Sequence, residues 1–256
     1  MFGRRRSARD RDRDAAANLA GEAYEELADD EDGAGGDQPA AGGVSRASGP
    51  WDVAEPHTDM QRVDLGSLQV PVLAGLDIQL VFTEQHGAWV TVRHEASELQ
   101  LQAFAAPKRD SLWDDVRAEI AAEIAATGGT SAEHSGPFGT ELLVRAPVQP
   151  GQPQAGMNSV RFAGVDGPRW FLRGLFTGPA AENAAAAAPL EALMREVVVN
   201  RGDHPVPPRD LLELRLPPDA AAALAEEQAR AEQEGSRFST PPPNPFERGP
   251  EFTETR

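Results

Sequence analysis

The sequence predicts an α+β fold in which an antiparallel sheet is covered by two helices. Several segments alternate apolar and polar residues with a period of two, which is typical of strands with one buried face. Two other segments carry apolar residues at helical spacing. The order along the chain is strands, helix, strands, helix. Strands outside a strand–helix alternation pair mostly antiparallel, and two amphipathic helices can cover their sheet, so this order favours an α/β/α sandwich.

Four strands are predicted before the first helix. A short strand is expected at Val63–Leu68, and residues 76–83, 88–94 and 98–105 then alternate apolar and polar side chains. Phe82 belongs to the apolar set that is expected to face the core. Three consecutive half-polar strands predict an antiparallel meander whose second face is solvated.

The first helix is expected to begin at Ser111, whose hydroxyl can cap it while two aspartates lie in the first turn. Gly128-Gly129 ends the helix. The residues of its apolar stripe are Leu112, Trp113, Val116, Ile120 and Ile124. This stripe predicts that the helix packs on the sheet.

A second group of strands and a second helix follow. Thr140–Ala146 is predicted as a strand, and Ser159–Val165 and Arg169–Phe176 are predicted to form a hairpin with its turn at Asp166-Gly167. The second helix lies within Ala180–Val198. Its firm part is expected to start at Pro189, because proline fits a first turn and breaks a helix interior.

The folded domain is predicted to span residues 49–216, between two tails. Gly49-Pro50 is a turn-forming pair directly before Trp51, the first large aromatic residue of the domain. Residues 1–48 are charged and carry few large apolar side chains, so burial cannot offset the entropy lost on ordering, and disorder is predicted. Residues 217–256 are predicted to hold a frayed helix and a proline-rich disordered tail.

The composition argues against several classes of function. A formal net charge of -17 is not that of a general nucleic-acid binder, which needs clustered Lys and Arg; only weak contact through Arg4, Arg5 and Arg6 is left open. The absence of cysteine removes disulfides, thiolate metal sites and cysteine nucleophiles. No signal-peptide pattern and no run long enough to span a membrane are present, so a cytoplasmic location is expected.

No residue is predicted to be catalytic or to bind a metal, and no cofactor is expected. The sequence has no nucleophile elbow and no phosphate-binding loop. Glu119 and Glu123 are spaced like an acid–base pair, but we interpret them as a solvated helix face. The five histidines lack helical spacing around a carboxylate, and we interpret them as surface or turn residues. They are His57, His86, His94, His134 and His204.

One constellation surrounds the predicted hairpin turn: Arg161, Arg169, Trp170 and Arg173. Alternation places Arg169 and Arg173 on one side of their strand and Trp170 on the other. A two-residue loop at Asp166-Gly167 would put Arg161 on the Trp170 face. One more loop residue would set Arg161 opposite Arg173, and facing arginines need an anion or a carboxylate between them.

Two interpretations of this hairpin remain open. In the first, the hairpin is an arginine cleft that binds an anionic ligand or an acidic partner segment, such as this chain's own Glu22–Asp37. In the second, the hairpin is a polar sheet face. In the second case Arg161 and its neighbours pair with Glu98 or Glu141, and we favour this interpretation.

Several uncommon strings resemble an actinobacterial family, the domain-of-unknown-function family numbered thirty-seven-ten. They occur in order between Trp51 and Leu216. The strings are Gly49-Pro50-Trp51-Asp52, Leu99–Pro107, Leu112-Trp113-Asp114, Gly136–Leu142 and Asp166–Gly174. The resemblance implies domain limits and a host type, and it carries no catalytic residue. The order of elements is also similar to the Mog1/PsbP-like sandwich, whose members are mostly adaptors, although a fold does not imply a function.

Two hypotheses of function follow. The first is a non-catalytic module that presents a sheet face or edge to an unidentified protein partner. The alternative is a binding domain or enzyme for an anionic, phosphate-bearing small molecule at Arg161, Arg169 and Arg173. The sequence does not indicate an oligomeric state.

Overall fold

The computed structural model describes residues 46, 48–83, 87–108, 110–147, 157–217, 220 and 222. The chain divides into two compact units, Met1–Leu216 and Pro217–Arg256, and the helices and strands below belong to the first. Nearly all of the two predicted tails lies outside the described residues. Their disorder stays a prediction.

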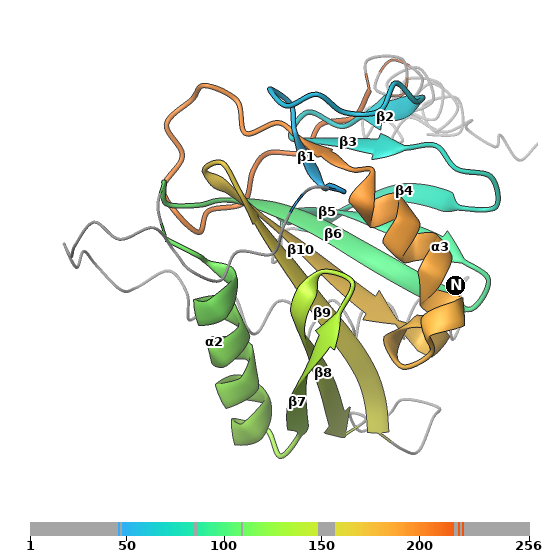
Figure 1. Ribbon diagram of the computed structural model, residues 1–256, viewed down its shortest axis with the longest axis vertical. Coiled ribbons are helices and arrows are strands. Elements are labelled where there is room, and N and C mark those ends of the chain that lie inside the picture. Colours follow the sequence, from blue (N-terminus) through green and yellow to red (C-terminus); the bar gives the residue numbers. More distant parts are fainter. Residues whose placement is uncertain are drawn as a thin grey trace, which may run out of the picture. The chain divides into compact units, whose positions relative to one another are not determined.

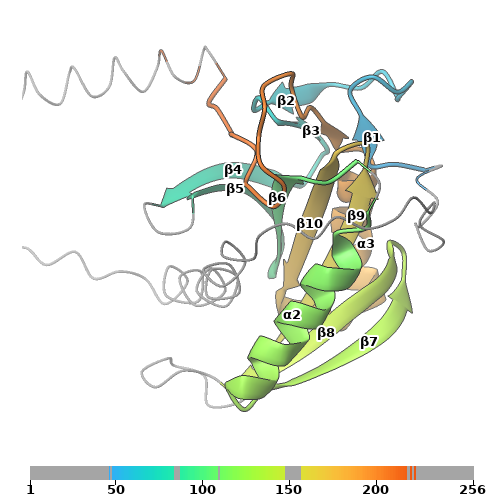
Figure 2. The same ribbon diagram turned by 90° about the vertical axis from the view of Figure 1, so that its left-hand side faces the viewer.

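The central element is a seven-stranded sheet in which all neighbouring strands pair antiparallel (Figure 1). In spatial order its strands are β4 (Asp77–Thr83), β5 (Gly87–His94), β6 (Ser97–Ala105), β10 (Trp170–Thr177), β9 (Met157–Gly167), β8 (Gly139–Pro147) and β7 (Thr130–Gly136). The helix α2 packs on one face and α3 on the other, as Figure 2 shows. This arrangement confirms the predicted α+β class with an antiparallel sheet covered by two helices.

The helix α2 (Trp113–Ala126) begins at a carboxylate from a distant strand. Asp166 on β9 accepts hydrogen bonds from the Leu112 and Trp113 N–H groups, at 2.9 and 3.4 Å. The Ser111 hydroxyl also donates to Asp166, at 2.7 Å. The prediction that Ser111 caps the helix is therefore wrong, because Asp166 satisfies the first free N–H groups in its place.

The apolar stripe of α2 packs on the sheet, as predicted. Trp113, Val116, Ile120 and Ile124 are buried, and they form one core with Phe162, Phe171 and other side chains of the strands. Gly164 on β9 leaves room for the indole, since a Cβ there would lie 2.2 Å from Trp113 Cδ2. The helix stops before Gly128, whose φ of +81° suits glycine.

The helix α3 (Ala184–Arg195) follows a short 3₁₀ turn, η2 (Gly178–Ala181). Asn183 caps α3 by accepting hydrogen bonds from the N–H groups of Ala185 and Ala186. Pro189 lies inside the helix, so the prediction that the firm part starts there is wrong. The cap and the alanine run, which has the highest helix propensity, extend the helix toward its N-terminus.

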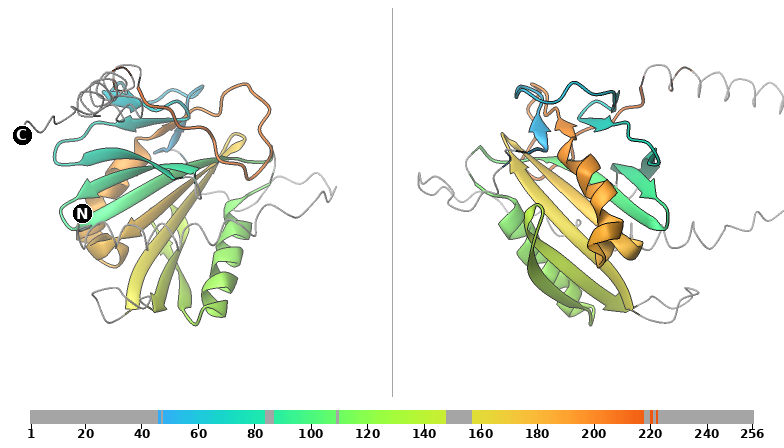
Figure 3. Two further views of the ribbon diagram at one scale, coloured as in Figure 1. Left: turned by 180° about the vertical axis from the view of Figure 1, so that it is seen from behind. Right: turned by 45° about the vertical axis from the view of Figure 1, so that its right-hand side comes forward.

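A second, four-stranded sheet was not predicted. Its order is β1 (Trp51–Asp52), β11 (Val198–Val199), β3 (Leu68–Pro71) and β2 (Arg62–Asp64), and β1 pairs parallel with β11. It shares a core with α3 on one side of the large sheet (Figure 3). Two predictions are corrected here. Val63–Leu68 is split by a turn at Gly66, whose φ is +85°, and Val198 lies on a strand and not on the helix.

Candidate functional site

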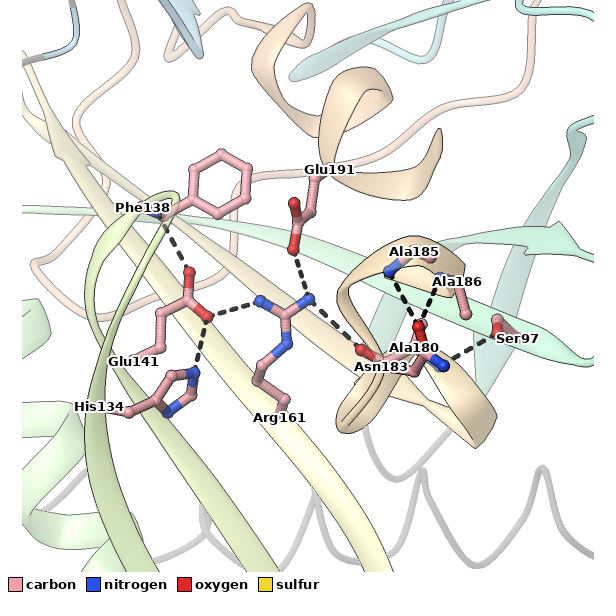
Figure 4. A network of polar contacts seen from close by, with 10 residues as sticks. All are labelled: Ser97, His134, Phe138, Glu141, Arg161, Ala180, Asn183, Ala185, Ala186 and Glu191. Atoms are coloured by element: carbon pink, nitrogen blue, oxygen red, sulfur yellow. Dashed lines mark hydrogen bonds and ion pairs between the residues drawn. The ribbon is translucent and has the colours of Figure 1, made fainter. Parts of the chain in front are cut away.

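A network of buried charges joins the sheet to α3 (Figure 4). Arg161 on β9 donates hydrogen bonds to Glu141 on β8 at 2.6 Å and to Glu191 on α3 at 2.8 Å. The side chain of Glu141 is fully buried, and those of Arg161 and Glu191 are 6% and 11% exposed. One cation and two carboxylates are therefore held together with little access to water.

Neighbouring groups complete this network. Glu141 also accepts a hydrogen bond from the Phe138 N–H at 3.1 Å, and His134 Nε2 lies 3.4 Å from its second oxygen. The Arg161 guanidinium lies over the Phe176 ring, 4.1 Å from the centroid. Gly136 makes space for the carboxylate, since a Cβ there would lie 2.2 Å from Glu141 Cδ.

This arrangement acts as a clamp between elements. The guanidinium ties β8, β9 and α3 together, and it also donates to the Ala180 carbonyl of η2 at 3.4 Å. A planar guanidinium with several donors suits such a multiple contact. Arg161 and Glu141 are both buried. The contacts of Arg161 agree with the favoured interpretation, in which it pairs with Glu141.

The structure does not bring the four residues of the arginine hairpin into one cleft. The hairpin turn consists of Pro168 and Arg169, since Gly167 pairs with Trp170, and the predicted turn at Asp166-Gly167 is wrong. Arg161 pairs with Phe176 across the two strands. It therefore lies on the α3 face, the same face as Trp170, whereas Arg173 lies on the α2 face.

Local packing explains the position of this turn. Asp166 is engaged at the start of α2, and Gly167 must stay free of a Cβ, which would lie 2.1 Å from the Trp170 indole. Proline fixes its own φ at the first turn position, and Arg169 takes the second with a φ of +63°. Arg169 is exposed at the tip of the hairpin.

Trp170 is fully buried and joins the hairpin to the start of the domain. Its indole Nε1 donates a hydrogen bond to Asp52 Oδ2 at 2.7 Å. The Arg46 guanidinium lies 5.3 Å from the centroid of the indole ring, and it binds both oxygens of Glu55 at 2.8 Å. The Asp52 N–H also donates to Glu55. Trp170 is thus a structural residue in this position.

The lowered pKa of Glu55 predicts that the stability of the fold depends on pH. Hydrogen bonds from Arg46, opposed in part by burial and helped by the Asp52 N–H, hold the pKa of Glu55 below 4.5. A lowered pKa in the folded state adds stability above the unfolded value, and this contribution is lost as the pH falls through the folded value. Glu55→Gln should therefore cost stability at neutral pH and progressively less below pH 4.5. Urea unfolding of the wild type and of Glu55→Gln across this pH range measures the difference in their free energies of unfolding. A difference that does not shrink in acid would contradict the prediction.

Arg173 lies on a polar region of the α2 face, and we call this region the β5–β6–β10 face. Its guanidinium donates to the Gln102 amide oxygen and lies 5.7 Å from the Phe104 ring centroid. Gln100 and Thr91 continue the face across β6 and β5. These polar side chains are buried, so the predicted solvated face of the meander is wrong in this region.

The outer edge of the large sheet at β4 carries exposed apolar surface. Phe82 is 55% exposed, although its place in the alternation predicted burial. Ile78 and Leu80 on the same side of β4, and Val81 on the other, are half-buried. The alternation identified the correct face, but it could not show that β4 is an edge strand whose end extends beyond the core.

The other residues considered for metal binding or acid–base chemistry include Glu119 and His134, which make ordinary structural contacts. Among the described residues, no group of three or more His, Asp or Glu side chains is placed to hold a metal. Glu119 accepts a hydrogen bond from Arg209 at 2.9 Å, and His134 lies beside Glu141. His86 lies outside the described residues.

Comparison with known proteins places the chain in a family. The family model described as "Protein of unknown function (DUF3710)" matches residues 49–223, more than half of the chain. The chain belongs to this family. No curated protein matches it. A similar solved structure is the solution structure of the cyanobacterial PsbP protein (CyanoP) from Synechocystis sp. PCC 6803, with 11% identity and a TM-score of 0.33. That match covers 54% of this chain and 91% of the other.

Membership in this DUF3710 family agrees with the resemblance found in the sequence and assigns no activity. The helices of the described residues are all too short or too polar to cross a membrane. The actinobacterial source and the cytoplasmic location stay predictions.

Proposed function

We propose that this DUF3710 protein is a non-catalytic interaction module that binds an extended segment of a partner protein by strand addition at β4. The observation that carries the proposal is the outer edge of the seven-stranded sheet. There β4 is the terminal strand, and Phe82 at its end is 55% exposed. An edge strand presents a row of backbone groups to which another chain can pair.

The two edges of the seven-stranded sheet differ, and the difference favours β4 as the edge that accepts a partner strand. The opposite edge, β7 (Thr130–Gly136), is polar and almost entirely exposed, with Glu133 and His134 along it. Charged and polar side chains are the usual protection of an edge. On β4 the side chains of Ile78, Leu80 and Phe82 alternate on one face, which suits a partner strand with apolar residues at every second position.

The enclosed arginine network supports a non-catalytic role. Arg161, the central residue of the sequence-based site, is held between Glu141 and Glu191. The alternative function, binding of an anionic small molecule at Arg161, Arg169 and Arg173, stays a prediction. Its three residues lie on two faces and at a hairpin tip.

Selection of extended peptides against the full chain tests the proposal. Peptides with alternating apolar residues should be enriched, and Phe82→Asp should weaken their binding by about 30-fold, the effect of losing an aromatic anchor. Phe82→Leu should restore most of the affinity. Because Phe82 is largely exposed, Phe82→Asp should leave the unfolding curve almost unchanged.

Val53→Asp is the matched control. Val53 is 42% exposed and follows β1 in the small sheet, away from β4, so its substitution should leave peptide affinity unchanged. Equal binding of the selected peptides to the wild type and to Phe82→Asp would refute the proposed edge.

A further inference from the structure

The outer strand of the seven-stranded sheet is complementary to a second copy of itself. Among the described strands, β4 pairs with β5 alone, and its other side is the edge of the sheet. Figure 2 shows the strand pair β4 and β5 extending away from both helices. The sequence of β4, DIQLVFT, has no proline and no glycine, and its single charge is Asp77 at the first residue. Such an edge lacks the usual protection against pairing with another chain.

A two-fold axis through Leu80 pairs the whole of β4 with its copy. In an antiparallel pair, residues that lie opposite each other share one side of the sheet. Leu80 then lies opposite Leu80 of the second copy, Ile78 opposite Phe82, and Asp77 opposite Thr83. Registers displaced to either side keep the faces but leave one end of the strand unpaired. The register centred on Leu80 is therefore the one that uses the full length of β4.

The side chains that this register brings together suit each other. Ile78, Leu80 and Phe82 of both copies form one apolar row, in which a β-branched residue faces an aromatic residue at each end. Phe82 is 55% exposed in the single copy, and the pairing covers its ring. The two Asp77 carboxylates lie at opposite ends of the pair, about 20 Å apart, so like charges do not meet.

The opposite edge of the sheet limits the assembly to two copies. The strand β7 has the polar sequence TSAEHSG and is almost entirely exposed, which disfavours pairing along it. Pairing of β4 with β4 uses the same surface of both copies, as the interfaces of two-fold homodimers do. A closed dimer therefore forms, and not a fibre.

We infer that β4 pairs antiparallel with β4 of a second copy of this chain, so that the two large sheets join into one across a two-fold axis. The inference rests on the proposed strand addition at β4, and it names one partner of that edge. The formal net charge of -17 opposes the approach of two copies. The dimer should thus be weak, and added salt should tighten it by screening the repulsion.

Sedimentation equilibrium of the full chain measures the association. Between about 1 µM and 1 mM the mean mass should rise from that of one copy toward that of two, and more steeply at higher salt. Phe82→Asp places a carboxylate opposite Ile78 of the other copy and should weaken the dimer by at least about 10-fold. Val53→Asp, at an exposed position outside β4, should leave the association unchanged.

Single cysteines test the register, because the protein has no cysteine of its own. Leu80→Cys should form a disulfide between two copies on mild oxidation, since the opposite Cα atoms lie about 5 Å apart. Phe82→Cys should form none, because its positions in the two copies lie about 14 Å apart along the strands. A selected peptide that occupies β4 should suppress the cross-link of Leu80→Cys.

Exposed positions at the two ends of β4 provide a second test, should Leu80→Cys fail to fold. Asp77 and Thr83 are both exposed, and they lie opposite each other in the proposed pair. An equal mixture of Asp77→Cys and Thr83→Cys chains should give cross-linked dimers, whereas either variant alone should give none.

Two results would overturn the inference. One is a mean mass that stays at one copy up to about 1 mM at high salt, with no cross-link of Leu80→Cys or of the mixture. The other is a cross-link of Phe82→Cys in place of Leu80→Cys. If the chain stays a single copy while selected peptides bind the wild type better than Phe82→Asp, the dimer is refuted and the proposed function stands. If the peptides bind both chains equally, both proposals fail.

Discussion

Arg161→Met is expected to lower the free energy of unfolding by about 3–5 kcal/mol. The substitution leaves Glu141 and Glu191 as two buried carboxylates without their shared cation. Desolvated charges without a partner are far more costly than the pair itself contributes. Urea unfolding at neutral pH, followed by circular dichroism, measures the loss.

A triple variant distinguishes a missing partner from a general loss of packing. Arg161→Met, Glu141→Gln and Glu191→Gln together remove all three charges while keeping the side-chain volumes similar. We expect this variant to be more stable than Arg161→Met alone, because no uncompensated charge remains. If the triple variant is less stable than the single one, the clamp contributes through its contacts and the charge argument is incorrect.

The second large effect is expected at Trp170. Trp170→Ala should cost about 3–5 kcal/mol, because it empties a fully buried indole site. Trp170→Phe should cost about 1–3 kcal/mol, since it leaves Asp52 Oδ2 without its donor in a buried position. The same unfolding measurement gives both values.

Val53→Ala is the control for the Trp170 variants, because Val53 directly follows Asp52, the last residue of β1, and is 42% exposed. Its cost should stay below about 0.5 kcal/mol. A Trp170→Phe variant as stable as the wild type would show that the hydrogen bond to Asp52 adds nothing to stability.

The sequence predicts best those strands that bury one face. Residues 76–83, 88–94 and 98–105 alternate clearly, and the structure places β4, β5 and β6 there. Prediction fails where no side chain is buried: β7 has the sequence TSAEHSG, with no apolar alternation, and it forms because it pairs with β8. The very short strands β1 and β11 exist only because distant segments pair.

Turns and caps were mispredicted where a residue serves a distant element. Asp166 has the local character of a turn residue, yet its carboxylate starts α2, and the turn moves to Pro168 and Arg169. Pro189 has the local character of a helix start, but Asn183 begins the helix earlier. Local propensity is a weak guide when tertiary contacts satisfy the backbone.

The candidate site was predictable only in part. Alternation gives the faces of Trp170 and Arg173, and Glu141 was one of the two partners considered for Arg161. The face of Arg161 depends on the hairpin register. The turn lies two residues later than predicted, and this shift changes the pairing partner of Arg161 but leaves its face unchanged. The exposure of Phe82 and the burial of Gln100 and Gln102 depend on what lies beside β4 and above β6, and period-two patterns carry no information about either.

Hydrogen–deuterium exchange of the full chain, with and without a selected peptide, tests strand addition most directly. Pairing at the edge should slow exchange of those backbone amides of β4, within residues 77–83, that point away from β5, because a new strand occupies their outer hydrogen-bonding positions. Exchange along β7, residues 130–136, should stay unchanged. Protection at β7 or elsewhere in the domain, with none at β4, would contradict the proposed function.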